Sequence, residues 1–223
     1  MARLERLPEP DHIGAYRAVV FDLDGTLYDQ TRLRMMMAMR LSLHYLCHPF
    51  HIRELQLLKT FRHVRDRWEE YAPAAGQDDS AAKGAEGVEE DIYRYVANKH
   101  HADPSLVAKT VAHWIYDDPL AVLPRYTNRK LAAYIEQLRQ NHVLIFIFSD
   151  YPIPDKLRAL GITADGMYAP GDERNIALKP SPMGLELIMK DHGLAPENSL
   201  MVGDRDVKDG ESARRAGVDY FIV

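Results

Sequence analysis

Short apolar runs and helix-period patterns divide the chain into three stretches. Residues 18–21 form an apolar run that ends abruptly in Asp-Leu-Asp-Gly, which predicts a buried strand followed by a polar turn. From residue 31 to residue 119 the spacing of apolar residues is helical, and no segment there has the pattern of a strand. After residue 119, helix-like and strand-like segments alternate to the C-terminus. The pattern therefore predicts a strand, then a helical region, then an alternating region.

The helical stretch is predicted to hold four helices. They are expected around residues 33–46 and over residues 52–71, 88–99 and 104–116. In the first helix, apolar residues at i, i+3, i+4 and i+7 spacings indicate an amphipathic face. Met35, Met36, Met37 and Met39 could line an adaptable substrate pocket, but we expect them to pack against other helices. Asp103, followed by a proline, is the expected N-cap of the last helix. Residues 72–87, rich in Ala, Gly and Asp, predict a mobile loop.

The alternating stretch predicts a parallel sheet. Helices are expected over residues 128–141, 154–160, 181–192 and 207–216, and strands over residues 142–148, 166–168, 200–202 and 220–223. Alternating strands and helices are typical of a parallel sheet covered on both faces, and the first strand must join it because a lone strand is not stable. We therefore predict an α/β fold with a doubly wound, Rossmann-like core formed by residues 1–30 and 120–223. Residues 31–119 are predicted to be an all-helical insertion after the first strand.

Composition and charge narrow the range of partners. The 223 residues include 28 Lys and Arg against 33 Asp and Glu, and this net charge of −5 lacks the basic footprint of sequence-independent nucleic-acid binding. A single cysteine, Cys47, excludes an intramolecular disulfide and favours a reducing compartment. No segment approaches the roughly 18 consecutive apolar residues of a membrane span, and residues 1–16 do not resemble a signal peptide. We therefore expect a cytoplasmic protein whose partner is neither nucleic acid nor a membrane.

Acidic residues collect where the predicted strands end. Asp22 and Asp24 follow the first strand two residues apart, so that on an extended backbone both side chains lean the same way. Gly25 allows the backbone to turn sharply beneath a bound ligand. Two close carboxylates raise each other's pKa unless a cation relieves them, and Asp204, from a different strand, supplies a third oxygen for a hard ion such as Mg²⁺. Because ligands of parallel sheets bind at the carboxyl ends of the strands, the sequence predicts a Mg²⁺ site there.

Four short motifs stand at or near the predicted strand ends. The first is Asp-Leu-Asp-Gly-Thr-Leu at residues 22–27, and the second is Ser149 at the end of an apolar strand. The third is Lys179 followed by Pro180, and the fourth is Gly-Asp-Arg-Asp-Val-Lys-Asp at residues 203–209. In this order the four motifs resemble those of the haloacid dehalogenase (HAD) superfamily, and the helical insertion between the first and second resembles its C1-type cap domain. The resemblance therefore implies a hydrolase with an α/β core and a helical cap.

The resemblance implies a role for each matching residue. Asp22 would be the nucleophile that forms an aspartyl-phosphate intermediate. Asp24, held in place by Thr26, would protonate the leaving oxygen and then take a proton from the hydrolytic water. Ser149 and the backbone N–H of Asp150 would bind the oxygens of the transferring phosphoryl group.

The resemblance also implies how charge would be balanced. Lys179 would neutralise charge on both the nucleophile and the phosphoryl group. Mg²⁺ would bind the Asp22 carboxylate, the main-chain carbonyl of Asp24 and the Asp204 carboxylate. Asp209, the second acidic position of the fourth motif, is expected to orient Lys179 or a metal-bound water rather than to bind the metal directly.

The implied function is Mg²⁺-dependent hydrolysis of a small phosphomonoester, with a small phosphorylated metabolite as the partner. The dehalogenases that name the superfamily lack a second Asp two residues after the nucleophile and need no metal, so Asp24 favours phosphoryl chemistry. A phosphomutase is an alternative within that chemistry. A catalytically silent binding or regulatory protein is the alternative outside it, although none of the expected catalytic residues is missing. Neither the substrate nor the oligomeric state can be read from the sequence.

Four residues have ambiguous roles. Residue 205 is Arg where Ser or Thr is common in the superfamily. Arg205 could reach toward the cleft or face solvent, and we expect it to face solvent. Arg32 and Arg34 are exposed by default, and they become substrate anchors if the helical region folds over the site. Asp150 stands where Asn is frequent, so that its backbone role is expected to persist while its side chain has no assigned role.

Overall fold

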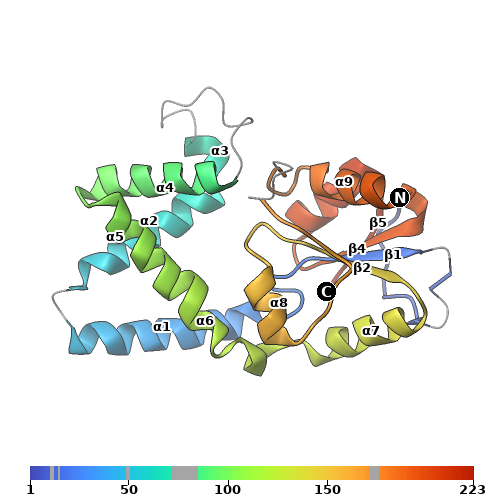
Figure 1. The fold of residues 1–223 in the computed structure, drawn as a ribbon, viewed down its shortest axis with the longest axis horizontal. Coiled ribbons are helices and arrows are strands. Elements are labelled where there is room, and N and C mark those ends of the chain that lie inside the picture. The colour runs from blue at the N-terminus through green and yellow to red at the C-terminus, as the bar shows by residue number, and fades with distance from the viewer. Residues whose placement is uncertain (11–12, 15, 49–50, 72–84, 171–175) are drawn as a thin grey trace. The chain divides into compact units, whose positions relative to one another are not determined.

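The computed structural model of the chain describes all residues except 11–12, 15, 49–50, 72–84 and 171–175. The chain forms two compact units, the sheet unit of Met1–Thr31 and Leu123–Val223, and the helical unit of Arg32–Val122 (Figure 1). The strands are β1 Ala18–Phe21, β2 Leu144–Phe148, β3 Gly166–Tyr168, β4 Ser199–Gly203 and β5 Asp219–Ile222. The α-helices are α1 Gln30–Cys47, α2 Arg53–Asp66, α3 Trp68–Tyr71, α4 Ala85–His100, α5 Pro104–Val111, α6 Asp118–Leu120, α7 Arg129–Gln140, α8 Pro154–Leu160, α9 Met183–His192 and α10 Glu211–Ala216. The 3₁₀ and π helices are η4 Ala112–Asp117, η5 Leu123–Tyr126, η6 Pro196–Asn198 and η7 Asp206–Gly210.

The sheet unit is built on five parallel strands in the order β3-β2-β1-β4-β5. β1 lies at the centre, where Ala18 pairs with Leu144 on one side and with Ser199 on the other. The chain adds β2 and β3 to one side of β1 and then returns to add β4 and β5 to the other. This order confirms the predicted doubly wound α/β fold, and it places the point where the winding reverses between β1 and β4.

Helices cover both faces of the sheet, as the buried character of its strands requires. Every residue of β1 and β4 is buried, which explains why these strands have unbroken apolar runs rather than alternating ones. On one face, alternate residues such as Val20, Phe146 and Met201 pack with apolar residues of α9. Figure 1 shows α9 on this face and α7 on the opposite one. The sheet therefore forms the middle layer of three.

The predicted helices are present, but the one expected over residues 52–71 is divided at Arg67 into α2 and α3. Two others change character part of the way along. The helix expected over residues 104–116 begins as α5, with the Asp103 side chain accepting the predicted cap hydrogen bond from Ser105 N at 2.7 Å, and continues as the π helix η4. The helix expected over residues 207–216 likewise begins as the π helix η7 before it becomes α10. Of the predicted loop over residues 72–87, residues 72–84 lie outside the described part of the chain. The remaining three belong to α4.

The prediction that the methionines of the first helix pack against other helices is wrong in part. Of these residues Met37 is buried, whereas Met35 and Met39 are exposed on α1. Leu43 and Leu46, which the helical spacing placed on the same apolar face, are exposed as well. Apolar residues surround most of α1, so their spacing fits several faces and does not identify the buried one.

The helical unit has its own apolar core. Helices α2, α4 and α5 pack against one another and bury residues such as Phe61, Val96 and Val107.

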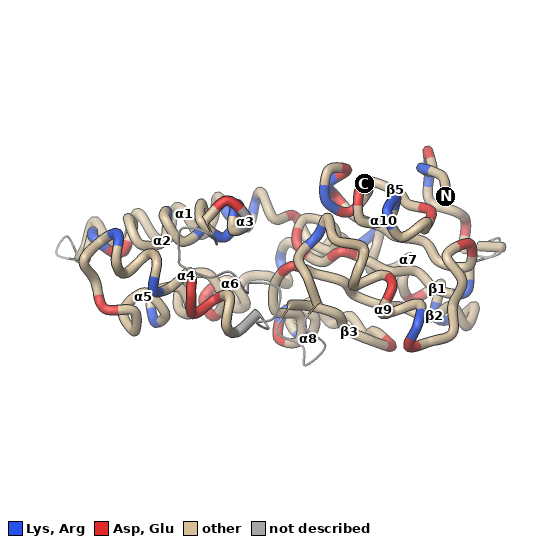
Figure 2. The backbone as a smooth tube through the Cα atoms, turned by 90° about the horizontal axis from the view of Figure 1, so that it is seen from above, with Lys and Arg blue, Asp and Glu red and all other residues tan. Residues whose placement is uncertain are grey.

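Basic and acidic segments alternate along the backbone of both units (Figure 2). None of the described helices combines the length and the apolar composition that a bilayer crossing requires.

A close contact between α9 and β2 yields a test of the sheet packing. A Cβ atom added at Gly184 would lie 2.4 Å from two ring atoms of Phe148, which is fully buried. We expect Gly184→Ala to lower the free energy of unfolding by about 1–3 kcal/mol, because the aromatic ring has no space to move. The exposed Lys190 on the same helix gives the control Lys190→Ala, with an expected change within about 0.5 kcal/mol. Urea denaturation of the two variants checks this, and equal midpoints would contradict the packing described.

Candidate active site

Three neighbouring strands bring the predicted motifs to one edge of the sheet. Asp22 follows β1, Ser149 follows β2, and Asp204 follows β4. Because β2 and β4 flank β1 on either side and all three strands are parallel, their carboxyl ends open at the same edge. The motifs are far apart in sequence, and the strand order alone makes their strand ends adjacent.

Gly25 permits the close approach of the first and fourth motifs. Its φ of +106° lies in a region that residues with a side chain rarely adopt. A Cβ atom at this position would lie 2.3 Å from Asp204 Oδ2. Any other residue would therefore strain the turn and push the Asp204 carboxylate out of position.

A buried lysine joins the first, third and fourth motifs. The Lys179 ammonium donates to Asp22 Oδ1, to Asp209 Oδ1 at 2.6 Å and to the carbonyl of Phe148 at 3.2 Å, and its side chain is 0% exposed. Burial alone would lower the pKa of Lys179, but the Asp22 and Asp209 carboxylates raise it instead, so the lysine is charged. An unpaired charge at this depth would be strongly destabilising, so the lysine needs at least one of its carboxylate partners.

Burial shifts the titration of Asp22. It raises the pKa of Asp22 to about 7, against the opposing effect of the Lys179 ammonium. The Thr26 hydroxyl donates to Asp22 Oδ2 at 2.9 Å. The expectation that Thr26 holds Asp24 is therefore wrong. The turn after β1 directs the hydroxyl back to the carboxylate four residues earlier.

Three donors surround the Asp24 carboxylate. Tyr28 and Lys156 donate to Oδ1, and Ser149 donates to Oδ2 at 3.0 Å. Burial opposes ionisation, yet the Lys156 ammonium and these hydroxyls hold the pKa of Asp24 below its usual value. The sequence analysis missed Tyr28 and Lys156. Tyr28 stands four residues after Asp24, but Lys156 is on α8 and no local pattern connects it with the first motif.

The π helix η7 presents Asp209 to the site. Asp209 Oδ2 accepts a hydrogen bond from the backbone N–H of Arg205 at 2.9 Å, and Oδ1 accepts from Lys179. A Cβ atom at Gly203 would lie 2.4 Å from Asp209 Cβ and Cγ, so the two segments touch. π-helical turns are uncommon and are often found at functional sites, which agrees with the position of this one.

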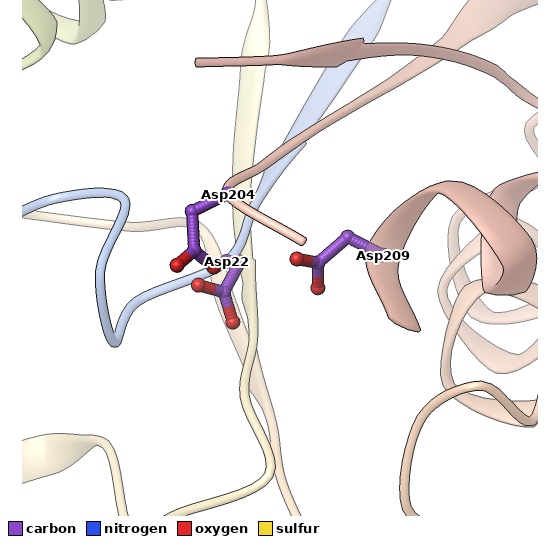
Figure 3. A group of neighbouring side chains, drawn as sticks. All are labelled: Asp22, Asp204 and Asp209. Carbon is purple, nitrogen blue, oxygen red and sulfur yellow. The ribbon is translucent and has the colours of Figure 1, made fainter. Parts of the chain in front are cut away.

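The group formed by Asp22, Asp204 and Asp209 suits a divalent cation. One oxygen of each carboxylate lies within 4.8 Å of the others (Figure 3). Asp204 Oδ1 is buried without a hydrogen-bond partner, and burial raises the pKa of this carboxyl group. A bound cation would satisfy that oxygen, and three carboxylates match the preference of Mg²⁺ for oxygen ligands. The Asp24 side chain points to other partners, so its part in a metal site through the main-chain carbonyl stays a prediction.

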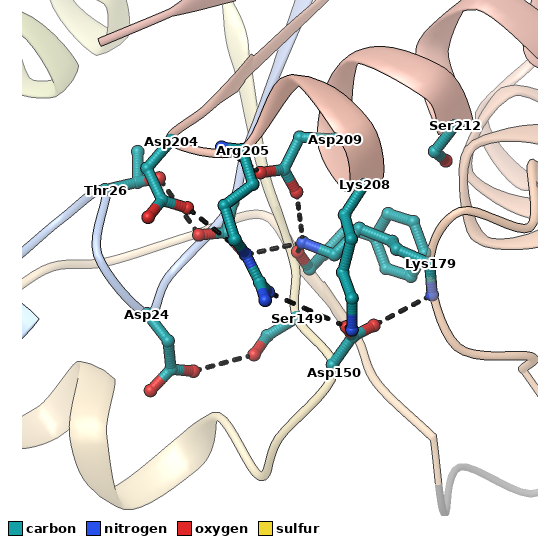
Figure 4. A network of polar contacts seen from close by, with 12 residues as sticks. Asp24, Thr26, Ser149, Asp150, Lys179, Asp204, Arg205, Lys208, Asp209 and Ser212 are labelled. Carbon is teal, nitrogen blue, oxygen red and sulfur yellow. Dashed lines mark hydrogen bonds and ion pairs between the residues drawn. The ribbon is translucent and has the colours of Figure 1, made fainter. Parts of the chain in front are cut away.

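Asp150 has the side-chain role that sequence analysis left open. Its Oδ1 accepts from the backbone N–H of Lys179 at 2.9 Å, which ties the third motif to the second. Its Oδ2 accepts from Lys208 at 3.3 Å and lies 3.9 Å from the Arg205 guanidinium (Figure 4). The expectation that Arg205 faces solvent is wrong, because the carboxylates of Asp150 and Asp204 attract it toward the site.

The structure brings the predicted site residues of the sheet unit together, and two further candidates belong to the helical unit. Arg32 and Arg34 are exposed residues near the start of α1, in the helical unit. Their role in binding substrate stays a prediction.

Three solved structures share the fold of this chain. The 2-haloacid dehalogenase from Pseudomonas syringae pv. Tomato has 15% identity and a TM-score of 0.62 over 93% of this chain and 86% of that chain. The Bacillus subtilis protein YfnB, solved bound to magnesium, has 15% identity and a TM-score of 0.60 over 92% and 87%. A predicted phosphoglycolate phosphatase from Haemophilus somnus has 17% identity and a TM-score of 0.54 over 94% and 85%. At these identities the likeness shows the fold alone.

The comparison with family models identifies the family of the chain as well as its fold. No curated protein matches the chain. The model of the haloacid dehalogenase-like hydrolases, however, matches residues 16–217, which include all four motifs and both units. With that match and the shared fold, the chain belongs to the haloacid dehalogenase-like hydrolase family.

Proposed function

We propose that this hydrolase is a Mg²⁺-dependent phosphatase that cleaves a small phosphomonoester through an aspartyl-phosphate on Asp22. The observation that carries the proposal is the Asp24 carboxylate, two residues from Asp22 and held by three donors, beside the three-carboxylate group. This arrangement offers a nucleophile, a separate group for proton transfer and a site for a cation. A phosphoryl group needs all three, because its transfer places charge on several oxygens.

Different residues of the sheet unit take the separate roles that the proposed reaction requires. Asp22, Asp204 and the main-chain carbonyl of Asp24 would hold Mg²⁺, which when bound supplies positive charge for the phosphoryl oxygens and the attacking carboxylate. Asp209, whose two oxygens accept from Lys179 and from the Arg205 N–H, would orient the lysine beside the metal. Lys179, which is paired with Asp22, supplies a second, fixed positive charge to the nucleophile. The Ser149 hydroxyl and the Asp150 backbone N–H would bind phosphoryl oxygens.

The reaction then has two balanced steps. In the first, an Asp22 oxygen bonds to phosphorus while the ester P–O bond breaks, and the leaving oxygen takes a proton from Asp24. In the second, Asp24 takes a proton from water, the water oxygen bonds to phosphorus, and the bond to Asp22 breaks to release inorganic phosphate. The donors that keep Asp24 ionised favour its role as a base, so the first step requires a proton to reach Asp24 before the ester bond breaks.

Dehalogenation is the competing chemistry within the family, because structures of similar fold include a 2-haloacid dehalogenase. That chemistry needs neither a second aspartate two residues after the nucleophile nor a metal site. The test is turnover of p-nitrophenyl phosphate and of 2-chloropropionate, each with Mg²⁺ and with EDTA. Phosphate release that requires Mg²⁺ supports the proposal, whereas halide release that EDTA does not affect contradicts it.

Replacing the nucleophile is expected to separate activity from folding. Asp22→Asn is expected to remove phosphatase turnover, because an amide is a poor nucleophile, while Lys179 keeps Asp209 and the Phe148 carbonyl as partners. The midpoint of thermal unfolding is expected to stay close to that of the wild type. The exposed Asp66 gives the matched control Asp66→Asn, with full activity expected. Substantial turnover by Asp22→Asn, with mass spectrometry excluding deamidation, would rule out Asp22 as the nucleophile.

The affinity for Mg²⁺ is expected to rise with pH. Burial raises the pKa of Asp22 to about 7 in the metal-free protein, and Mg²⁺ binds the ionised carboxylate, so below this pKa a proton must leave first. For one such group, binding is expected to be about tenfold tighter at pH 8 than at pH 6. Isothermal titration calorimetry in buffers of different ionisation enthalpy measures both the affinity and the proton release. Asp22→Asn is expected to bind Mg²⁺ more weakly and without proton release near pH 7, and unchanged proton release in that variant would assign the titration to another group.

A further inference from the structure

The guanidinium of Arg205 lies beside the proposed phosphoryl site with its hydrogen-bond donors largely unused. In the described part of the chain it forms ion pairs with Asp150 Oδ2, 3.9 Å from Nη2, and with Asp204 Oδ1, 3.8 Å from Nε. Both distances are too long for a hydrogen bond. Nε is buried and has no hydrogen-bond partner. A buried N–H without a partner is unfavourable unless a ligand supplies the acceptor.

The backbone of Arg205 is fixed, although its side chain makes only these long contacts. Its N–H donates to Asp209 Oδ2 at 2.9 Å, and its carbonyl accepts from the N–H of Lys208 at 3.1 Å and of Asp209 at 2.7 Å. The residue therefore starts the π helix η7 from a defined position. Because this backbone is already ordered, the Arg205 side chain can bind a ligand with little further loss of backbone conformational entropy.

Neither carboxylate near Arg205 depends on it as a partner. Asp150 already accepts from Lys208 and from the Lys179 backbone. Asp204 belongs to the carboxylate group that suits a divalent cation, and a cation there would neutralise its attraction for the guanidinium. With both carboxylates satisfied, the guanidinium would need an anion from outside the protein. About two-fifths of the side chain (39%) is exposed, so an anion can reach it.

We propose that Arg205 binds the non-bridging oxygens of the transferring phosphoryl group, as a cationic group in addition to Lys179. Figure 4 shows Arg205 extending from the Asp204 segment toward Ser149 and Asp150, the two residues expected to bind phosphoryl oxygens. The planar guanidinium can donate two parallel hydrogen bonds to such a group, which an ammonium cannot do. The inference rests on the proposed phosphatase function and adds a residue that the four motifs do not assign.

The test compares Arg205→Met, Arg205→Lys and the wild type at saturating Mg²⁺. Three readouts are needed: kcat/KM for p-nitrophenyl phosphate, kcat/KM for phosphoglycolate, and the inhibition constant of orthovanadate, which mimics the phosphoryl group at its five-coordinate stage. Arg205→Met is expected to lower kcat/KM and to weaken vanadate inhibition, each by roughly ten- to hundredfold, because one charged bidentate contact is lost. Arg205→Lys, which keeps the charge without the planar geometry, is expected to fall between the two. If Arg205→Met does not fold, the comparison of Arg205→Lys with the wild type tests the proposal.

The controls separate this role from the alternatives. Arg215, exposed on α10 and paired with Glu211, gives the matched variant Arg215→Met with the same change in net charge and an expected loss of less than twofold. An effect of Arg205→Met confined to phosphoglycolate, with p-nitrophenyl phosphate and vanadate unaffected, would overturn the proposal and assign Arg205 to a second anionic group of the substrate. Unchanged values for all three compounds would overturn it as well. A wild type that neither hydrolyses phosphoesters nor binds vanadate would overturn the proposed function itself, and this inference with it.

Discussion

The ion pairs of the buried Lys179 hold the catalytic edge of the sheet together. One ammonium, removed from solvent, contacts carboxylates that arrive from the end of β1 and from η7, and a carbonyl from the end of β2. These segments are distant in sequence, and a charge at that depth is tolerated only when it is paired. Correct folding of the sheet unit and assembly of the site are therefore the same event. The raised pKa of Asp22 follows from the same burial.

The fold could be predicted in detail because its signals are local. Neighbouring residues alone determine the apolar run of β1, the alternation after residue 119 and the Asp103 cap. The observed strands and the cap lie within one or two residues of the predicted positions. The buried face of α1 could not be predicted, because apolar residues surround most of that helix. The division of two predicted helices into π and α segments was missed too, since helical periodicity does not distinguish a local widening of the turn.

The contacts between side chains in the candidate site could likewise be predicted only in part. The order of the four motifs identified the strand ends that meet, because a parallel sheet leaves few ways to arrange them. The hydrogen bonds between those ends were not predictable in the same way. Thr26 bonds to Asp22 rather than Asp24, Lys156 reaches Asp24 from α8, and Arg205 turns inward. Each of these contacts depends on the distance between segments, which only the packed structure defines.

The ion pairs of Lys179 also constrain how this site can be lost in evolution. Removing the lysine alone would leave two buried carboxylates facing each other, and removing both carboxylates would leave a buried ammonium unpaired. Either change costs stability, whereas apolar residues of similar volume at all three positions can be tolerated. A lineage that stops using the enzyme is therefore under pressure to keep Lys179 with at least one of its carboxylates long after selection for turnover has ended. An inactive descendant can replace Asp22 alone, because Asp209 still pairs with the lysine, but it is expected to lose Lys179 and its last carboxylate partner together.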